Sequence, residues 1–169
     1  IHAFRSFLNN KDFIEAETPV LQPIYGGANA RPFTTHHHTL DEKLYLRIAV
    51  ELYLKRLIIG GFDKVYELSK NFRNEGMDRN HNPEFSMLEF YQAYSDVYDI
   101  MDLTESMIKE VANTVSATKV DFDGHTIDFK AKFNRASLGQ LFDEEFHGQD
   151  ILGDEEKIKN IASKLNLDS

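Results

Sequence analysis

The sequence contains no cysteine, which excludes disulfides, thiolate metal sites and cysteine nucleophiles. It also has no run of about 18 apolar residues, so we expect no membrane-spanning segment. Positive charge is scarce: 28 Asp and Glu outnumber 19 Lys and Arg, for a formal charge of −9. This balance argues against a surface that coats nucleic acid in general, although it allows a local basic site. Together these features favour a cytoplasmic protein.

Hydrophobic residues make up 41% and aromatic residues 12% of the 169 positions, which is enough for a folded core. The length suits one domain, or one domain and part of another. The apolar pattern of a helix begins at the first residue, with Ile1, Phe4, Phe7 and Leu8 on one face. We therefore expect a fragment of a longer chain.

The periodicity of the apolar residues predicts a mixture of helices and strands. In chain order we predict a helix over 1–10, a strand over 13–16, a loop over 25–43, a helix over 44–59, strands over 64–72 and 85–94, a helix over 96–115, a hairpin over 120–129, and helices over 137–146 and 154–166. This order is not a regular strand–helix–strand alternation, so it favours an α+β domain on an antiparallel sheet.

The strand predicted over 85–94 contains a carboxylate among residues suited to burial. Alternation places Phe85, Met87, Glu89 and Tyr91 on one face. A buried carboxylate is costly unless a cation neutralises it. Two interpretations stay open: Glu89 forms a structural ion pair with an internal arginine, or Glu89 and the Tyr91 hydroxyl bind a cationic ligand.

The loop over 73–84 has the side chains of a nucleotide site. Arg73, Arg79 and His81 are suited to phosphate oxygens, Phe85 offers a flat face for a base, and Glu75 offers a hydrogen-bonding group for the base edge. A solvated turn of mixed charge is the alternative, and it describes most loops of this kind.

Three further features are weaker signals. Adjacent histidines at 36–38 point in different directions, so we favour loop packing or substrate hydrogen bonding over a metal site. Gly27 indicates a tight turn or a close approach of the backbone to a ligand. Glu51 falls within the helix predicted over 44–59, where most glutamates are solvated.

The segment over 72–94 resembles motif 2 of the class II lysyl-tRNA synthetases. It reads Phe-Arg-Asn-Glu-Gly at 72–76, His-Asn-Pro-Glu-Phe at 81–85 and Glu-Phe-Tyr-Gln-Ala-Tyr at 89–94. Residues 13–21, with Pro19, are similar to motif 1, and residues 26–37 and 45–57 are similar to the loop and helix that follow it. Aspartyl and asparaginyl enzymes share the Phe-Arg-x-Glu start, but the two later segments indicate the lysine branch.

The resemblance implies ATP-dependent activation of L-lysine and its transfer to tRNA(Lys). It assigns Arg73 as the catalytic residue at the α-phosphate, Glu75 to the adenine amino group, Phe85 to stacking on adenine, and His81 and Asn82 to the triphosphate. For lysine it assigns Gly27 and Glu89 to the α-ammonium, and Glu51 and Tyr91 to the ε-ammonium. An arginine at the α-phosphate offsets the repulsion between two approaching anions.

The resemblance also implies a domain arrangement. Residues 1–135 would form the front half of a class II catalytic domain, with an antiparallel sheet flanked by helices, and residues 136–169 would begin a helical insertion between motifs 2 and 3. The motif 3 arginine and the ligands of Mg²⁺ are then expected after residue 169, with no metal ligands in this chain. We therefore expect residues 1–169 alone to form no lysyl-tRNA, which an aminoacylation assay of the purified chain would test.

Motif 1 implies a homodimer, in which the apolar face from Ile1 to Leu8 is a candidate buried patch. Packing of this face on its own domain is the alternative. Two other functions stay open: a synthetase-like paralog that lysylates a protein lysine, and a non-catalytic binding module. Such paralogs share the 81–85 segment but usually depart from Ala93-Tyr94, and the intact set of Arg73, Glu75, Phe85 and Glu89 argues against a module.

Overall fold

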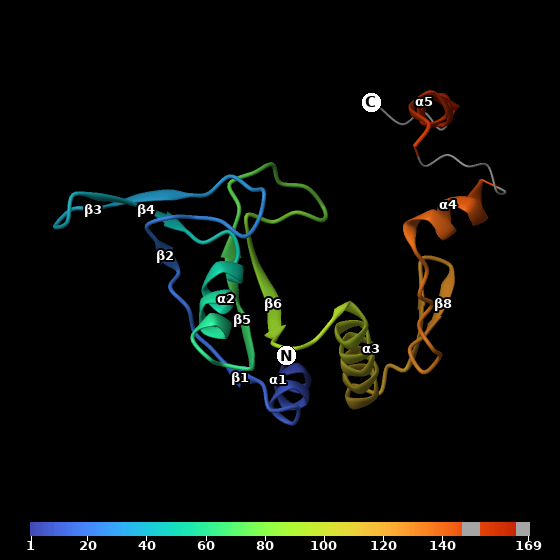
Figure 1. Cartoon of the computed structure of the whole chain (residues 1–169), viewed down its shortest axis with the longest axis horizontal. Helices are drawn as coiled ribbons and strands as arrows, with labels where there is room; N and C mark the ends of the chain where they lie inside the picture. Colours follow the sequence, from blue (N-terminus) through green and yellow to red (C-terminus); the bar gives the residue numbers. More distant parts are fainter. Residues whose placement is uncertain (147–152, 165–169) are drawn as a thin grey trace. The chain divides into compact units, whose positions relative to one another are not determined.

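A computed structural model describes residues 1–146 and 153–164. The chain divides into two compact units, Ile1–Lys130 and Ala131–Ser169. The first unit contains helices α1 (His2–Asn9), α2 (Glu51–Ile59) and α3 (Val97–Thr114), and strands β1 (Ile14–Glu15), β2 (Leu21–Gln22), β3 (Thr34–His37), β4 (Glu42–Leu46), β5 (Lys64–Phe72), β6 (Glu84–Gln92), β7 (Lys119–Phe122) and β8 (His125–Asp128) (Figure 1). The second contains α4 (Leu138–Glu145) and α5 (Glu155–Lys164).

None of the helices in the described ranges combines the length and apolar character needed to cross a membrane.

The sheet that carries the predicted site residues of the 64–94 hairpin has the order β1-β5-β6. Strands β5 and β6 form a long antiparallel hairpin that pairs from Lys64 with Gln92 to Phe72 with Glu84, as the sequence predicts. The expectation of an antiparallel sheet is wrong for β1, which pairs parallel to β5. The chain passes through β2, β3, β4 and α2 before it returns as β5, and a parallel pair needs a long crossover of this kind.

Helices α1 and α3 cover one face of this sheet. The core on that face consists of Phe7, Leu8, Phe13, Tyr66 and Met107. Leu8 is fully buried and Phe7 is 9% exposed, so the apolar face of α1 packs on its own unit. At these two residues the structure therefore favours packing on the same domain over a dimer patch. Only Ile1 of the four predicted face residues is largely exposed, at 69%.

Helix α2 covers the opposite face of the sheet. Val50, Leu54 and Val65 are fully buried there, and Tyr91 packs against them. Cross-strand neighbours on this face are Asn71 with Phe85, Ser69 with Met87 and Glu67 with Glu89. The predicted candidate site residues of β6 therefore lie on the α2 side of the sheet.

The helix predicted over 44–59 and the loop predicted over 25–43 are both partly wrong. Residues 42–46 form β4, which pairs with β2 on one side and with β3 on the other. The apolar residues from Leu44 to Leu46 suit a helix or a strand, and long-range pairing decides between them. As a result α2 begins at Glu51, which lies in its first turn and not in its middle.

Three local predictions are confirmed. The Asp96 side chain caps α3 by accepting from the Tyr98 and Asp99 backbone N–H groups, and Asp99 completes the capping box. Asp123 and Gly124 both have positive φ in the turn between β7 and β8, as a type I′ hairpin requires. Helices α4 and α5 begin within one residue of their predicted starts; the predicted end of the last helix at 165–166 lies outside the described residues.

The stability of the first unit depends on pH through the Tyr66 hydroxyl. Its hydroxyl lies 3.0 Å from both Asn9 Oδ1 and Glu15 Oε2. Burial, followed by the hydrogen bond to Glu15 and its negative charge, raises the pKa of Tyr66 from 10.0 to about 12. The folded state therefore holds this proton more tightly than the unfolded chain. The stability it contributes is complete below pH 10 and is lost as the pH rises through 12.

We expect Tyr66→Phe to lower the free energy of unfolding by about 1 kcal/mol near neutral pH, because one buried hydrogen bond is lost. The difference from the wild type should shrink between pH 10 and 12. Urea unfolding across this range measures it. Tyr94→Phe is the matched control, since Tyr94 is 99% exposed; a Tyr66→Phe difference that stays constant with pH would contradict the assignment.

Candidate active site

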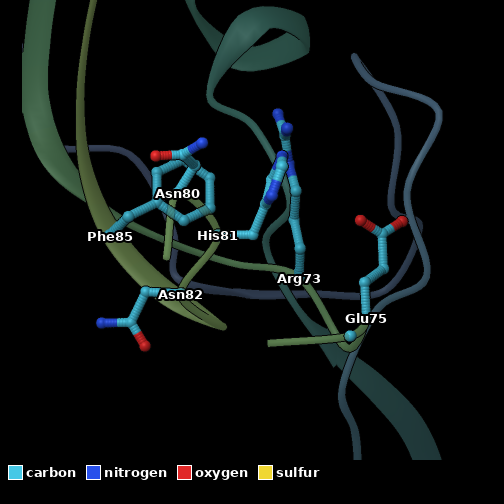
Figure 2. Close-up of a pocket in the computed structure, with 7 residues that line it drawn as sticks. Arg73, Glu75, Asn80, His81, Asn82 and Phe85 are labelled. Atoms are coloured by element: carbon cyan, nitrogen blue, oxygen red, sulfur yellow. The ribbon is translucent and has the colours of Figure 1, made fainter. Parts of the chain in front are cut away.

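A pocket of about 260 Å³ lies where β5 ends and β6 begins. Its lining is Arg73, Glu75, Gly76, Asn80, His81, Asn82 and Phe85. Of the predicted nucleotide residues, Arg73, Glu75, His81, Asn82 and Phe85 therefore line one pocket (Figure 2), whereas Arg79 is not in its lining. The hairpin brings them together because Phe72 pairs with Glu84 and the Arg73 backbone N–H donates to Pro83 O at 2.9 Å.

The Arg73 guanidinium lies against the ring of Phe85. Its Cζ is 5.1 Å from the ring centre, a distance that suits a cation–π contact. The Arg73 Nε also donates to Ile48 O at 3.4 Å. Arg73 is half-buried, so its remaining N–H groups are available to an anion in the pocket.

Asp78 orients His81, and the sequence analysis missed this residue. One Asp78 oxygen accepts from the backbone N–H groups of Asn80 and His81, and His81 Nδ1 lies 2.8 Å from it. The hydrogen bond from the Asn80 backbone, followed by that from the His81 ring, lowers the pKa of the Asp78 carboxyl. An aspartate in a polar loop is a signal for such a turn, because its side chain accepts from the backbone N–H two residues on. In Figure 2 the Asn82 side chain points away from Arg73.

Glu75 joins this loop to the loop around Arg31. Its Oε1 accepts from the Arg31 backbone N–H at 3.3 Å, and the Asn74 backbone N–H donates to Arg31 O at 2.7 Å. An adjoining hollow of about 610 Å³ shares Glu75 and Gly76 with the first pocket. Arg31 is a second residue that sequence reasoning missed, because no local pattern shows that these two loops meet.

The four residues predicted to bind the substrate lysine form two pairs. Gly27 has a φ of +85°, and a Cβ built on it would lie 2.9 Å from Glu51 Cβ. Gly27 therefore lies close to the first turn of α2, and its approach to a ligand stays a prediction. Glu51 in turn accepts from Lys55 Nζ at 2.6 Å.

Tyr91 and Glu89 form the second pair. The Tyr91 hydroxyl donates to Glu89 Oε2 at 2.9 Å. Burial, followed by this hydrogen bond, raises the pKa of Tyr91, so the hydroxyl keeps its proton as a donor. Lys55 Nζ, 5.9 Å from the Tyr91 ring centre, lies between the two pairs.

The structure separates the two interpretations of Glu89. An internal arginine is present, but Arg47 pairs with Glu67, with Arg47 Nη1 2.6 Å from Glu67 Oε1. Glu67 lies directly opposite Glu89 in the hairpin. Across the residues described, no lysine or arginine pairs with Glu89, and its hydrogen-bond partner is Tyr91. Glu89 is half-buried.

The three histidines at 36–38 lie at the end of β3 and the start of the next turn. His36 Nε2 is 3.2 Å from Asp41 Oδ1. In the part of the chain that the structure describes, no three acidic, histidine or cysteine side chains gather as metal ligands would.

The comparisons with known proteins agree with this geometry. The family described as class II tRNA synthetases (D, K and N) matches residues 1–163. The lysine–tRNA ligase of Methanoculleus marisnigri is 58% identical over 152 residues, which are 89% of this chain and 30% of that protein. The lysine–tRNA ligase of Clostridium novyi is 52% identical over 99% of this chain and 33% of its own length. That of Thioalkalivibrio sulfidiphilus is 46% identical over 99% and 34%. The chain thus spans about a third of the length of these curated relatives.

Proposed function

Because the chain belongs to the class II tRNA synthetases of the D, K and N group, we propose that its protein activates L-lysine with ATP and transfers it to tRNA(Lys). This membership confirms the resemblance read from motifs 1 and 2. The choice of lysine rests on Glu89, a half-buried carboxylate that is hydrogen-bonded by Tyr91 and paired with no lysine or arginine in the described ranges. A cationic substrate side chain would supply the missing charge.

We propose that the pocket at the end of the β5–β6 hairpin binds ATP. Phe85 would stack on the adenine, Glu75 would accept from its amino group, and His81 and Asn82 would hold the triphosphate. Arg73 would lie beside the α-phosphate, where fixed positive charge stabilises the negative charge that develops as the lysine carboxylate attacks. ATP is expected with Mg²⁺; in the described ranges no three acidic, histidine or cysteine side chains gather as its ligands would.

The contacts favour a different assignment of the four lysine-binding residues to the two ammonium groups of lysine from the one that the resemblance implies. Gly27 touches Glu51, and Tyr91 donates to Glu89, so each pair is suited to one ammonium group. Arg73 contacts Ile48 O, three residues before Glu51, so the Gly27–Glu51 pair belongs to the reacting end of lysine. Lys55 pairs with Glu51, and its Nζ lies 5.9 Å from the Tyr91 ring centre, so the Glu89–Tyr91 pair lies beside the first pair, where the other end of the same lysine would reach. We therefore assign the α-ammonium to Gly27 and Glu51, and the ε-ammonium to Glu89 and Tyr91.

Two larger features are part of the proposal. Residues 1–135 would form the front half of the catalytic domain and residues 136–169 the start of the insertion that follows motif 2. Motif 1 would form a homodimer interface. Sedimentation of the full-length protein tests the dimer, and a monomer at every concentration would contradict it.

The function is tested by ATP–pyrophosphate exchange with the full-length protein, without tRNA. The amino acids are lysine, a β-lysine isomer, aspartate and asparagine. We expect exchange with lysine alone. Preference for β-lysine would instead support a protein-modifying paralog, and no exchange with any of the four would support a binding module.

Gly27→Ala tests the close approach to Glu51. A Cβ at this position would lie 2.9 Å from Glu51 Cβ and 3.2 Å from Ala49 Cβ, and neither of these atoms can move without its backbone. We expect the KM for lysine to rise about tenfold or more, because Glu51 is displaced from its ligand. Lysine-dependent exchange measures the change.

Gly61→Ala is the matched control. Gly61 also has a positive φ, +101°, but a Cβ there meets nothing within 4 Å. It therefore carries the backbone strain of the substitution without the close contact. An equal rise in KM for both variants would show that strain alone is responsible.

A further inference from the structure

Arg47 and Glu67 form an ion pair in the interior of the first unit. Their side chains are 4% and 3% exposed, and Arg47 Nη1 lies 2.6 Å from Glu67 Oε1. Removal of two charges from water is costly, so a buried pair is weak grounds for expecting added stability. Its presence so close to the candidate active site calls for another role.

The pair connects three segments that are distant in the sequence. Glu67 on β5 accepts from the Thr18 hydroxyl at 2.6 Å and from the Thr18 backbone N–H at 3.2 Å. Arg47 donates to Thr18 O at 2.9 Å and to Lys70 O at 2.9 Å. The segment around Thr18, the end of β4 and the strand β5 are thus held at one point.

This point lies directly beside Arg73. The Phe72 backbone N–H donates to Arg47 O at 2.9 Å, and the Arg73 Nε donates to Ile48 O at 3.4 Å. The backbone of Arg47 and Ile48 therefore holds both the residue before Arg73 and the Arg73 side chain. The Arg47 side chain, through Glu67 and Thr18, fixes that backbone in place.

We propose that Arg47, Glu67 and Thr18 are positioning residues that hold Arg73 in the orientation required at the α-phosphate. This inference rests on the proposed function for the identity of the phosphate, but the positioning itself is a property of this chain. A displacement of a catalytic group by about 1 Å can cost roughly 100-fold in rate. The buried charges would then be kept for orientation of Arg73 and not for stability.

The first experiment observes Arg73 directly. In the 15N-labelled full-length protein, the Nε–Hε signal of Arg73 is identified by its loss in Arg73→Lys. Thr18→Val removes the hydroxyl that donates to Glu67 with little change in shape, and we expect it to shift or broaden this signal. Thr18→Ser keeps the hydroxyl and should leave the signal in place. Glu67→Gln is a second variant, and the dispersion of the amide spectrum reports whether each variant folds.

The second experiment measures exchange kinetics in the full-length protein. Thr18→Val should lower kcat roughly 10- to 100-fold and leave the KM values for ATP and lysine unchanged, whereas Thr18→Ser should restore kcat. In an Arg73→Ala background, Thr18→Val should add no further loss, because both changes remove the same interaction. If the role of Thr18 were merely structural, the losses of kcat from Thr18→Val and from Arg73→Ala would add in the double variant.

The outcomes separate the two proposals. An unchanged Arg73 signal in folded Thr18→Val and Glu67→Gln would overturn the positioning role whatever the activity. Absence of lysine-dependent exchange in the wild type would overturn the proposed function, while the Arg73 signal would still decide the positioning role.

Discussion

Glu89→Gln is expected to lower kcat/KM for lysine in ATP–pyrophosphate exchange by about 100-fold, equivalent to about 3 kcal/mol. The change removes the charge that Glu89 offers to the ε-ammonium, and it leaves that ammonium desolvated without a counter-ion. The Tyr91 hydroxyl can still donate to the amide oxygen, so the local structure is retained. The KM for ATP should stay nearly unchanged, because Phe85 and Arg73 are untouched.

Two competitors identify the end of lysine that Glu89 binds. Norleucine lacks the ε-ammonium, and 6-aminohexanoate lacks the α-ammonium. In Glu89→Gln the advantage of lysine over norleucine should fall sharply, whereas its advantage over 6-aminohexanoate should remain. Glu51→Gln is the matched control and should show the reverse pattern. Unchanged lysine kinetics in Glu89→Gln would mean that Glu89 is only structural, and an exchanged pattern would reverse the assignment of the two ends.

Arg73→Ala is expected to lower kcat for exchange by roughly 1,000-fold. Loss of one preorganised donor to a developing negative charge costs about 100- to 1,000-fold in comparable sites, and Arg73 supplies a full charge as well. Arg73→Lys should recover only part of this loss, since an ammonium lacks the planar pair of donors and the stacking on Phe85. Single-turnover adenylate formation measures the chemical step.

Arg56→Ala controls for the loss of an arginine from the same unit. Arg56 lies on α2 with its Cζ 4.8 Å from the centre of the Tyr53 ring, and it is not among the residues that line the pocket at the β5–β6 hairpin. We expect its kcat to remain near that of the wild type. If Arg73→Ala lost no more activity than Arg56→Ala, Arg73 would have no role at the α-phosphate.

Much of the fold could be predicted because its signals are local. The alternation of β5 and β6, the Asp96 cap and the Asp123-Gly124 turn depend on neighbouring residues, and the structure confirms each. The start of α2 could not be predicted in this way. The residues before Glu51 suit a helix or a strand, and β4 forms because β2 and β3 lie on either side of it.

The sequence by itself determined the family and which residues gather at the end of the β5–β6 hairpin. The motif segments lie within one hairpin, so the order of the residues already places Arg73, Glu75, His81 and Phe85 together. The tertiary structure alone decided which carboxylates are neutralised inside the protein. The sequence alone does not distinguish Glu67 from Glu89 as the ion-pair partner of Arg47. In the structure Arg47 donates to Thr18 O and pairs with Glu67. That choice depends on contacts between segments far apart in the chain, and among the described residues it leaves Glu89 with Tyr91, and with no arginine or lysine, as its partner.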